Sequence, residues 1–177
     1  MFGCDFFFRL HPSGGVALFR SQLVQCTEVL DLAFQRLIEV WSSIPELYLL
    51  LVRALRALDR APRDPSVLLD AFLLKLMALE GYRPALAECA GCGRTAPLRC
   101  FSIVRGGGLC DRCRSGQEST LDRDTMPLLA ALLGDDLGAT AATVPAGTSR
   151  REAGALVKGY VEYHLERRLR SYPMVAR

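Results

Sequence analysis

Residues 89–113 read CAGCGRTAPLRCFSIVRGGGLCDRC and contain two C-x-x-C pairs, Cys89 with Cys92 and Cys110 with Cys113. Each C-x-x-C turn directs two thiolates towards one point, and two facing turns can close a tetrahedron around a zinc ion. Four protein ligands leave no open position for a substrate or an activated water, so such a metal stabilises structure and does no chemistry. The spacing therefore predicts a structural zinc site in a ribbon or knuckle over residues 86–115.

The same four cysteines could instead hold an iron–sulfur cluster, form disulfides or act as redox dithiols. A redox C-x-x-C is typical of a strand-to-helix junction in a βαβ unit, and the sequence shows no such unit. Disulfides need an oxidising compartment, whereas the N-terminus MFGCDFFFRL lacks the basic region that opens a signal peptide. Zinc is the favoured interpretation, and a reducing cytoplasm is the expected compartment.

Length and composition set broad limits on function. The chain has 177 residues, 50% of them hydrophobic, which is enough for a real core, and its net charge of +3 permits nucleic-acid binding without requiring it. Arg53 and Arg56 interrupt the longest apolar run, so no membrane span is expected. No P-loop, G-x-G-x-x-G or H-E-x-x-H motif is present, and no nucleophile–base pair is evident, so we expect no enzyme.

The rest of the chain is predicted to be mainly helical, with the zinc module inserted in a helical bundle. Residues 1–25 hold two apolar stretches around a turn and predict a short N-terminal β segment. Helical periodicity then predicts a helical domain over residues 26–85 and a helical return over residues 116–177, on either side of the module at 86–115.

Local signals set the ends of the predicted helices. Asp64 caps a helix with Pro65 at its first position, and Gly81 supplies the stop. A short helix is expected from Asp124 or Thr125 to Gly134. A last helix should begin at an S-x-x-E capping box formed by Ser149 and Glu152 and run to Pro173.

Other residues carry narrower predictions. Residues 98–104 are β-like, and the triple glycine at 106–108 predicts the turn back to the second cysteine pair. Cys100 is predicted to be a buried thiol. His164 is predicted to be a core histidine bonded to backbone or carboxylate, and the face of Leu68, Phe72, Leu76 and Leu79 is predicted to be core.

The cysteine module is basic. Between Cys89 and Arg114, the acidic residue Asp111 stands among five arginines: Arg94, Arg99, Arg105, Arg112 and Arg114. Forked guanidinium donors match phosphate oxygens, which makes these residues candidate DNA contacts. The alternative is that they are surface charges that keep a small domain soluble.

Three stretches resemble the bacterial recombination and repair mediator family RecO, especially its actinobacterial branch. They are DAFLLKLMALEGYRPALAECAGC at 70–92, FSIVRGGGLCDRC at 101–113 and YHLERRLRSYP at 163–173. The order of helix, C-x-x-C, ribbon, C-x-x-C and helix is more specific than the cysteines alone. The segment LHPSGGVALF at 10–19 also resembles the last OB-fold strand region of that family.

The resemblance implies an N-terminal OB-fold, a helical domain and a zinc module with Cys89, Cys92, Cys110 and Cys113 as ligands. Residues 1–25 would be a remnant of that OB-fold. Such proteins bind single- and double-stranded DNA, anneal complementary strands and help load RecA onto DNA coated with single-strand-binding protein. They act with RecR, often with RecF, in the nucleoid. The alternative is a truncated, zinc-stabilised interaction scaffold that does not itself bind DNA.

Overall fold

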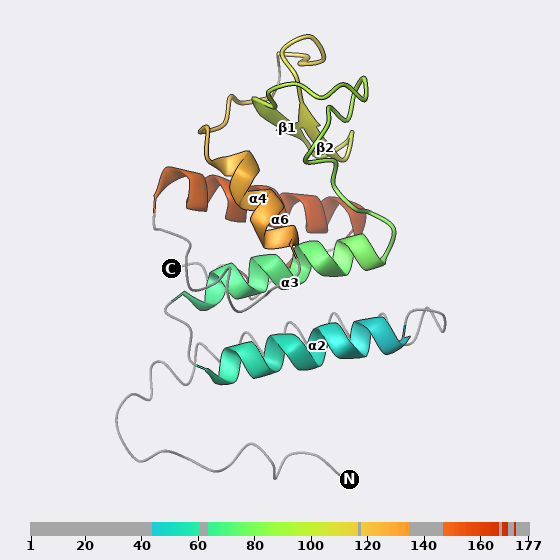
Figure 1. Ribbon diagram of the computed structural model, residues 1–177, viewed down its shortest axis with the longest axis vertical. Helices are drawn as coiled ribbons and strands as arrows, with labels where there is room; N and C mark the ends of the chain where they lie inside the picture. The colour runs from blue at the N-terminus through green and yellow to red at the C-terminus, as the bar shows by residue number, and fades with distance from the viewer. Residues whose placement is uncertain are drawn as a thin grey trace.

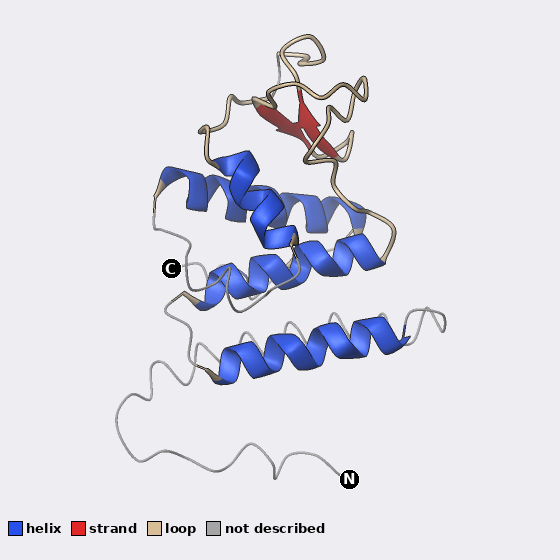
Figure 2. Ribbon diagram, in the orientation of Figure 1, coloured by secondary structure: helices blue, strands red, loops and turns tan. Residues whose placement is uncertain are grey.

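The computed structural model describes residues 44–60, 64–116, 118–134, 147–166, 168–169 and 172 (Figure 1). The predicted β segment at 1–25 lies outside the described residues, and the four predicted segment boundaries stay predictions. The described elements are α2 (Ile44–Asp59), α3 (Pro65–Leu79), β1 (Cys100–Ser102), β2 (Gly107–Leu109), α4 (Thr125–Leu133) and α6 (Thr148–His164). Figure 2 shows the helices gathered on one side of a small two-stranded sheet, so the mainly helical fold class is confirmed.

The centre of the helical part is α3, which packs against α2, α4 and α6. Asp64 has extended backbone geometry, and its side chain accepts from the Ser66 amide, so the predicted cap is confirmed. Gly81, with φ +87°, ends the helix as expected. Most of α3 is buried on all sides, although Leu79, predicted as core, is 37% exposed. No helix in the described part of the chain is long and apolar enough to cross a membrane.

The glycine triplet does not form the turn as a unit, which corrects the prediction. The antiparallel pair β1–β2 matches Cys100 with Leu109 and Ser102 with Gly107, so Gly107 and Gly108 lie in the strand. Of the three glycines only Gly106 lies in the turn at 103–106, with φ +74°. A Cβ on Gly107 would lie 2.5 Å from the Ala85 carbonyl oxygen, so the strand needs glycine for close backbone approach.

Gly107→Ala is therefore expected to destabilise the protein by about 1–3 kcal/mol, because the new methyl group meets backbone that cannot rotate away. Urea unfolding measures this loss. The control is Gly147→Ser, where an added Cβ meets nothing within 4 Å and serine suits the N-cap of α6, so its effect should stay within about 0.5 kcal/mol. Equal stability of both variants would contradict the packing described for β2.

The C-terminal part differs from prediction in two ways. The predicted capping box is wrong. The helix α6 starts at Thr148, and its N-cap Gly147 makes no side-chain hydrogen bond. Glu152 instead accepts a hydrogen bond from the Thr125 hydroxyl at 2.6 Å. Ser149 donates to Asp122 at 2.6 Å, so this pair joins α6 to the start of α4. The helix also ends at His164, well before Pro173.

A residue with left-handed backbone geometry follows the end of α6. Glu166 takes φ +52°, and the Glu162 carboxylate accepts from the Leu169 amide at 2.9 Å. Leu169 and Tyr172 then enter the core, where they are 6% and 5% exposed. The predicted short helix before α6 is confirmed, because α4 begins at Thr125 and its C-cap is Gly134.

Candidate metal centre and basic module

The structure brings the four predicted cysteines together. The sulfur atoms of Cys89, Cys92, Cys110 and Cys113 all lie within 4.8 Å of one another. Cys92 Sγ and Cys110 Sγ are 3.9 Å apart, close to the edge of about 3.8 Å in a tetrahedron with Zn–S bonds of about 2.3 Å. The cluster is therefore compatible with a structural metal ion.

Both cysteine pairs use the same local turn. In each, the amides of the second cysteine and of the following residue donate to the carbonyl oxygen of the first cysteine, at 2.8 to 3.3 Å. In the first pair the following residue is Gly93, whose φ of +68° suits glycine. Two copies of one turn face each other across the hairpin, which explains how sequence spacing alone located the site.

Backbone amides prepare one of the sulfurs for metal binding. Cys89 Sγ accepts from the amides of Cys110 and Gly91, each at 3.4 Å, and these bonds lower the pKa of the Cys89 thiol to about 6. Hydrogen bonds to Cys92 and Cys89 raise the pKa of the Cys113 thiol to about 12. Thiols this close together resist ionising at the same time, because their negative charges repel one another. A divalent cation offsets that repulsion and allows all four to become thiolates.

A small core of its own supports the cluster. Cys100 and Leu109 are fully buried beside Cys89 and Cys110, separately from the main core. Burial raises the pKa of the Cys100 thiol, so Cys100 stays neutral, and the prediction of a buried thiol is confirmed. Cys92 is the most solvent-exposed of the four clustered cysteines.

All five predicted arginines are exposed, but the structure spreads them around the module. Arg94, Arg112 and Arg114 belong to the two cysteine turns. Arg99 lines a hollow of about 530 Å³ against α4, whereas Arg105 lines a second hollow of about 480 Å³ against the end of α6. Arg105 also donates to the Cys113 carbonyl oxygen at 3.1 Å, which braces the second turn.

Comparison with known proteins relates the chain to a family. A family model described as "Recombination protein O C terminal" matches residues 34–173, which include every described helix and the cysteine module. The chain belongs to the RecO family. It is 44% identical over 124 residues to a DNA repair protein RecO of Streptomyces coelicolor. It is also 44% identical over 126 residues to a DNA repair protein RecO of Streptomyces griseus.

These alignments cover 70% of this chain but 49% of each relative, so the chain spans about half the length of the RecO proteins that it matches. No solved structure matches the chain. The residues that the family model matches contain the cysteine module, so the candidate metal centre lies in the region on which the family assignment depends.

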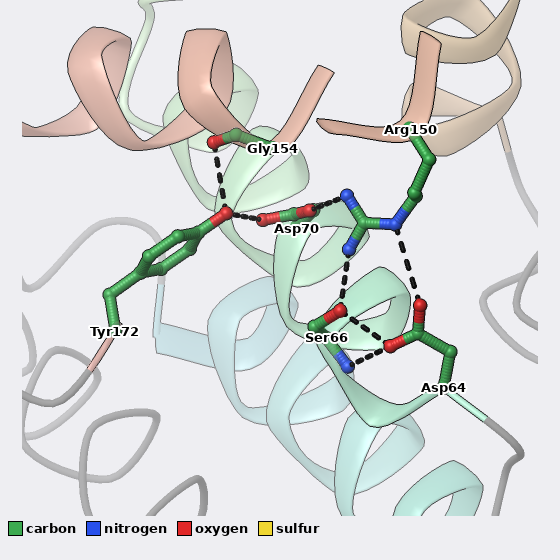
Figure 3. A network of polar contacts seen from close by, with 6 residues as sticks. All are labelled: Asp64, Ser66, Asp70, Arg150, Gly154 and Tyr172. Atoms are coloured by element: carbon green, nitrogen blue, oxygen red, sulfur yellow. Dashed lines mark hydrogen bonds and ion pairs between the residues drawn. The ribbon is translucent and has the colours of Figure 1, made fainter. Parts of the chain in front are cut away.

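In this RecO-family chain, a buried polar network joins α6 to α3, and sequence reasoning missed it (Figure 3). Asp70 is fully buried, and its carboxylate lies 2.6 Å from the Arg150 guanidinium. The Tyr172 hydroxyl donates to the same carboxylate at 2.6 Å, and Arg150 donates to Ser66 at 2.7 Å. Desolvation raises the pKa of Asp70, against the opposing effect of Arg150.

An aromatic cluster closes the other end of α6. The His164 ring lies 4.4 Å from Tyr160, 4.7 Å from Tyr82 and 5.1 Å from Tyr163, centroid to centroid. Desolvation lowers the pKa of His164, and a hydrogen bond to the Ile103 backbone partly offsets that effect. His164 was predicted to be a core residue, but it is half-buried, and its Nε2 has no hydrogen-bond partner among the described residues. No sequence pattern indicated this place for Tyr82, which follows the helix stop at Gly81.

Proposed function

We propose that this chain acts as the helical and zinc portion of a recombination and repair mediator, without enzymatic activity. Its role is to bind DNA and partner proteins through charge and surface shape, to promote annealing of complementary strands and to help load recombinase. The observation that carries this proposal is the family match over residues 34–173. The relatives named DNA repair protein RecO support it.

The resident metal in this proposal is one zinc ion. Four sulfur donors suit zinc, and the closed donor set leaves no position for catalysis. When bound, zinc would supply cross-linking between the two cysteine turns. Their arginines would then be held on a rigid support, which lowers the entropic cost of binding an extended anion.

DNA contact is assigned to the basic module. Arg94, Arg112 and Arg114 carry exposed side chains on the cysteine turns, while Arg99 and Arg105 flank them. Arginine pairs with phosphate through forked donors, so both single- and double-stranded DNA are suitable ligands. The protein partners proposed are RecR and single-strand-binding protein, with RecA and RecF acting indirectly, in the nucleoid of the cytoplasm.

A salt series tests the DNA contact. We expect binding of a labelled single-stranded oligonucleotide, followed by anisotropy, to weaken with salt at a log–log slope of roughly 0.7 per phosphate contact. The triple variant Arg94→Gln, Arg112→Gln and Arg114→Gln should reduce that slope by roughly 2, because three contacts are removed.

The matched control is Arg53→Gln, Arg56→Gln and Arg60→Gln, which removes the same charge from exposed positions in and just after α2. This control should keep the wild-type slope. An equal loss in both triple variants would indicate a general charge effect. Absence of DNA binding by a folded, metal-loaded chain would leave a scaffold that binds proteins alone.

A further inference from the structure

The hollow at the end of α6 has the composition of a small binding site. It has a volume of about 480 Å³ and lies where three segments meet: residues 81–93, the hairpin turn at 103–106, and the last turn of α6. Its lining includes an aromatic ring, two cations and a carboxylate, from Tyr82, Arg83, Arg105 and Glu88. Cys89 also lines it, so the hollow adjoins the metal centre.

Tyr82 forms a rigid platform at this hollow. Its amide donates to the Met77 carbonyl oxygen at 2.8 Å, and its own carbonyl oxygen accepts from the Tyr160 hydroxyl at 3.1 Å. Its ring packs on His164 with an interplanar angle of 33°, yet 43% of the residue is exposed. The backbone and one side of the ring are therefore fixed, while the ring remains open to a planar ligand.

The platform is also anchored to the core. Tyr160 is 2% exposed and packs edge-on against Phe101 of β1, with centroids 5.7 Å apart. Ring contacts from Tyr82 through His164 to Tyr160 thus run from solvent to the hairpin. An exposed aromatic ring that is held this firmly loses little conformational entropy when a ligand binds.

The charges around the hollow fit a nucleotide. Arg83 and Arg105 are exposed, and together they exceed the single carboxylate of Glu88. Arg105 uses one guanidinium nitrogen on the Cys113 carbonyl oxygen, which fixes its position and leaves other donors for an anion. Glu88 disfavours a phosphate inside the hollow but can accept from the amino group of a base.

We propose that this hollow holds one unpaired DNA base, stacked on Tyr82, with the flanking phosphates on Arg83 and Arg105. This inference rests on the proposed DNA binding. It predicts that the chain prefers single-stranded to double-stranded DNA. Base–aromatic stacking tolerates any sequence, because every base has a π-face. A duplex, whose bases are already stacked and paired, would use only the arginines.

Anisotropy with two probes of equal length tests the proposal: an oligodeoxycytidine and its abasic counterpart, which has the same phosphates. Tyr82→Leu should weaken oligodeoxycytidine binding roughly tenfold and leave abasic binding unchanged. Tyr82→Phe, which keeps the ring, should bind as wild type does. The matched control is Tyr48→Leu, at a tyrosine of α2 that is 61% exposed.

Photocrosslinking gives an independent readout. It uses the wild-type chain, so a folding defect of a variant cannot affect the result. An oligonucleotide carrying one 5-iododeoxyuridine should form its adduct at Tyr82 or His164, as mapped by mass spectrometry. Oligodeoxycytidine binding that Tyr82→Leu does not weaken, with adducts elsewhere, would overturn this site and leave the proposed DNA binding in place. Failure of the wild-type chain to bind either probe would overturn both.

Discussion

Replacing Cys110 with serine is expected to release the metal and loosen residues 86–115. Cys110 is 6% exposed, and its Sγ lies 3.9 Å from Cys92 Sγ, so the change removes a buried sulfur from the centre of the cluster. Apparent binding free energies of structural zinc reach about 10–16 kcal/mol, and metal binding is coupled to local folding. Metal content by mass spectrometry and hydrogen exchange over 86–115 measure the two effects.

Cys100→Ala provides the matched control, because Cys100 is a buried thiol of the same module that lies outside the four-cysteine cluster. It should keep one zinc per chain and lose only about 1 kcal/mol of stability. The helices should survive in Cys110→Ser, since they share a separate apolar core. Full zinc content and unchanged thermal stability in Cys110→Ser would show that the site is wrongly assigned.

Arg150→Met is expected to cost about 3–5 kcal/mol in the free energy of unfolding near neutral pH. The substitution leaves the Asp70 carboxylate buried without its ion-pair partner, and breaking a buried pair from one side is strongly destabilising. Urea unfolding measures the loss. Arg151→Met, at the exposed neighbouring position, is the control and should change stability by less than about 0.5 kcal/mol.

The pH dependence of this variant has a defined sign. Desolvation already raises the pKa of Asp70, and removing Arg150, which lowers it, raises it further. A group whose pKa is higher in the folded state favours folding at low pH and opposes it once pH rises through that folded value. The deficit of Arg150→Met should therefore shrink as pH falls from 8 towards 4. A deficit that grows on acidification would contradict the buried pair.

Interactions within one turn of the chain explain which features could be predicted from the sequence. The caps of α3 depend on Asp64, Pro65 and Gly81, which act within one turn of the chain, so the sequence locates that helix closely. The two cysteine turns likewise close through short backbone bonds, and their spacing revealed the cluster.

Long-range contacts account for the errors and omissions. Ser149 and Glu152 match a capping box, but their partners Asp122 and Thr125 come from another segment. The pairing of Asp70 with Arg150 and the place of Tyr82 beside His164 depend on how α6 crosses the fold. Gly107 was misplaced for the same reason, because the need for glycine comes from Ala85 across the bridge.

The most direct test of the mediator proposal is annealing of complementary oligonucleotides coated with the cognate single-strand-binding protein, using this chain in its metal-loaded form. We expect faster annealing that fades as salt rises, because phosphate contacts dominate the binding. The mediator proposal would be contradicted if a folded, zinc-loaded sample left the annealing rate unchanged.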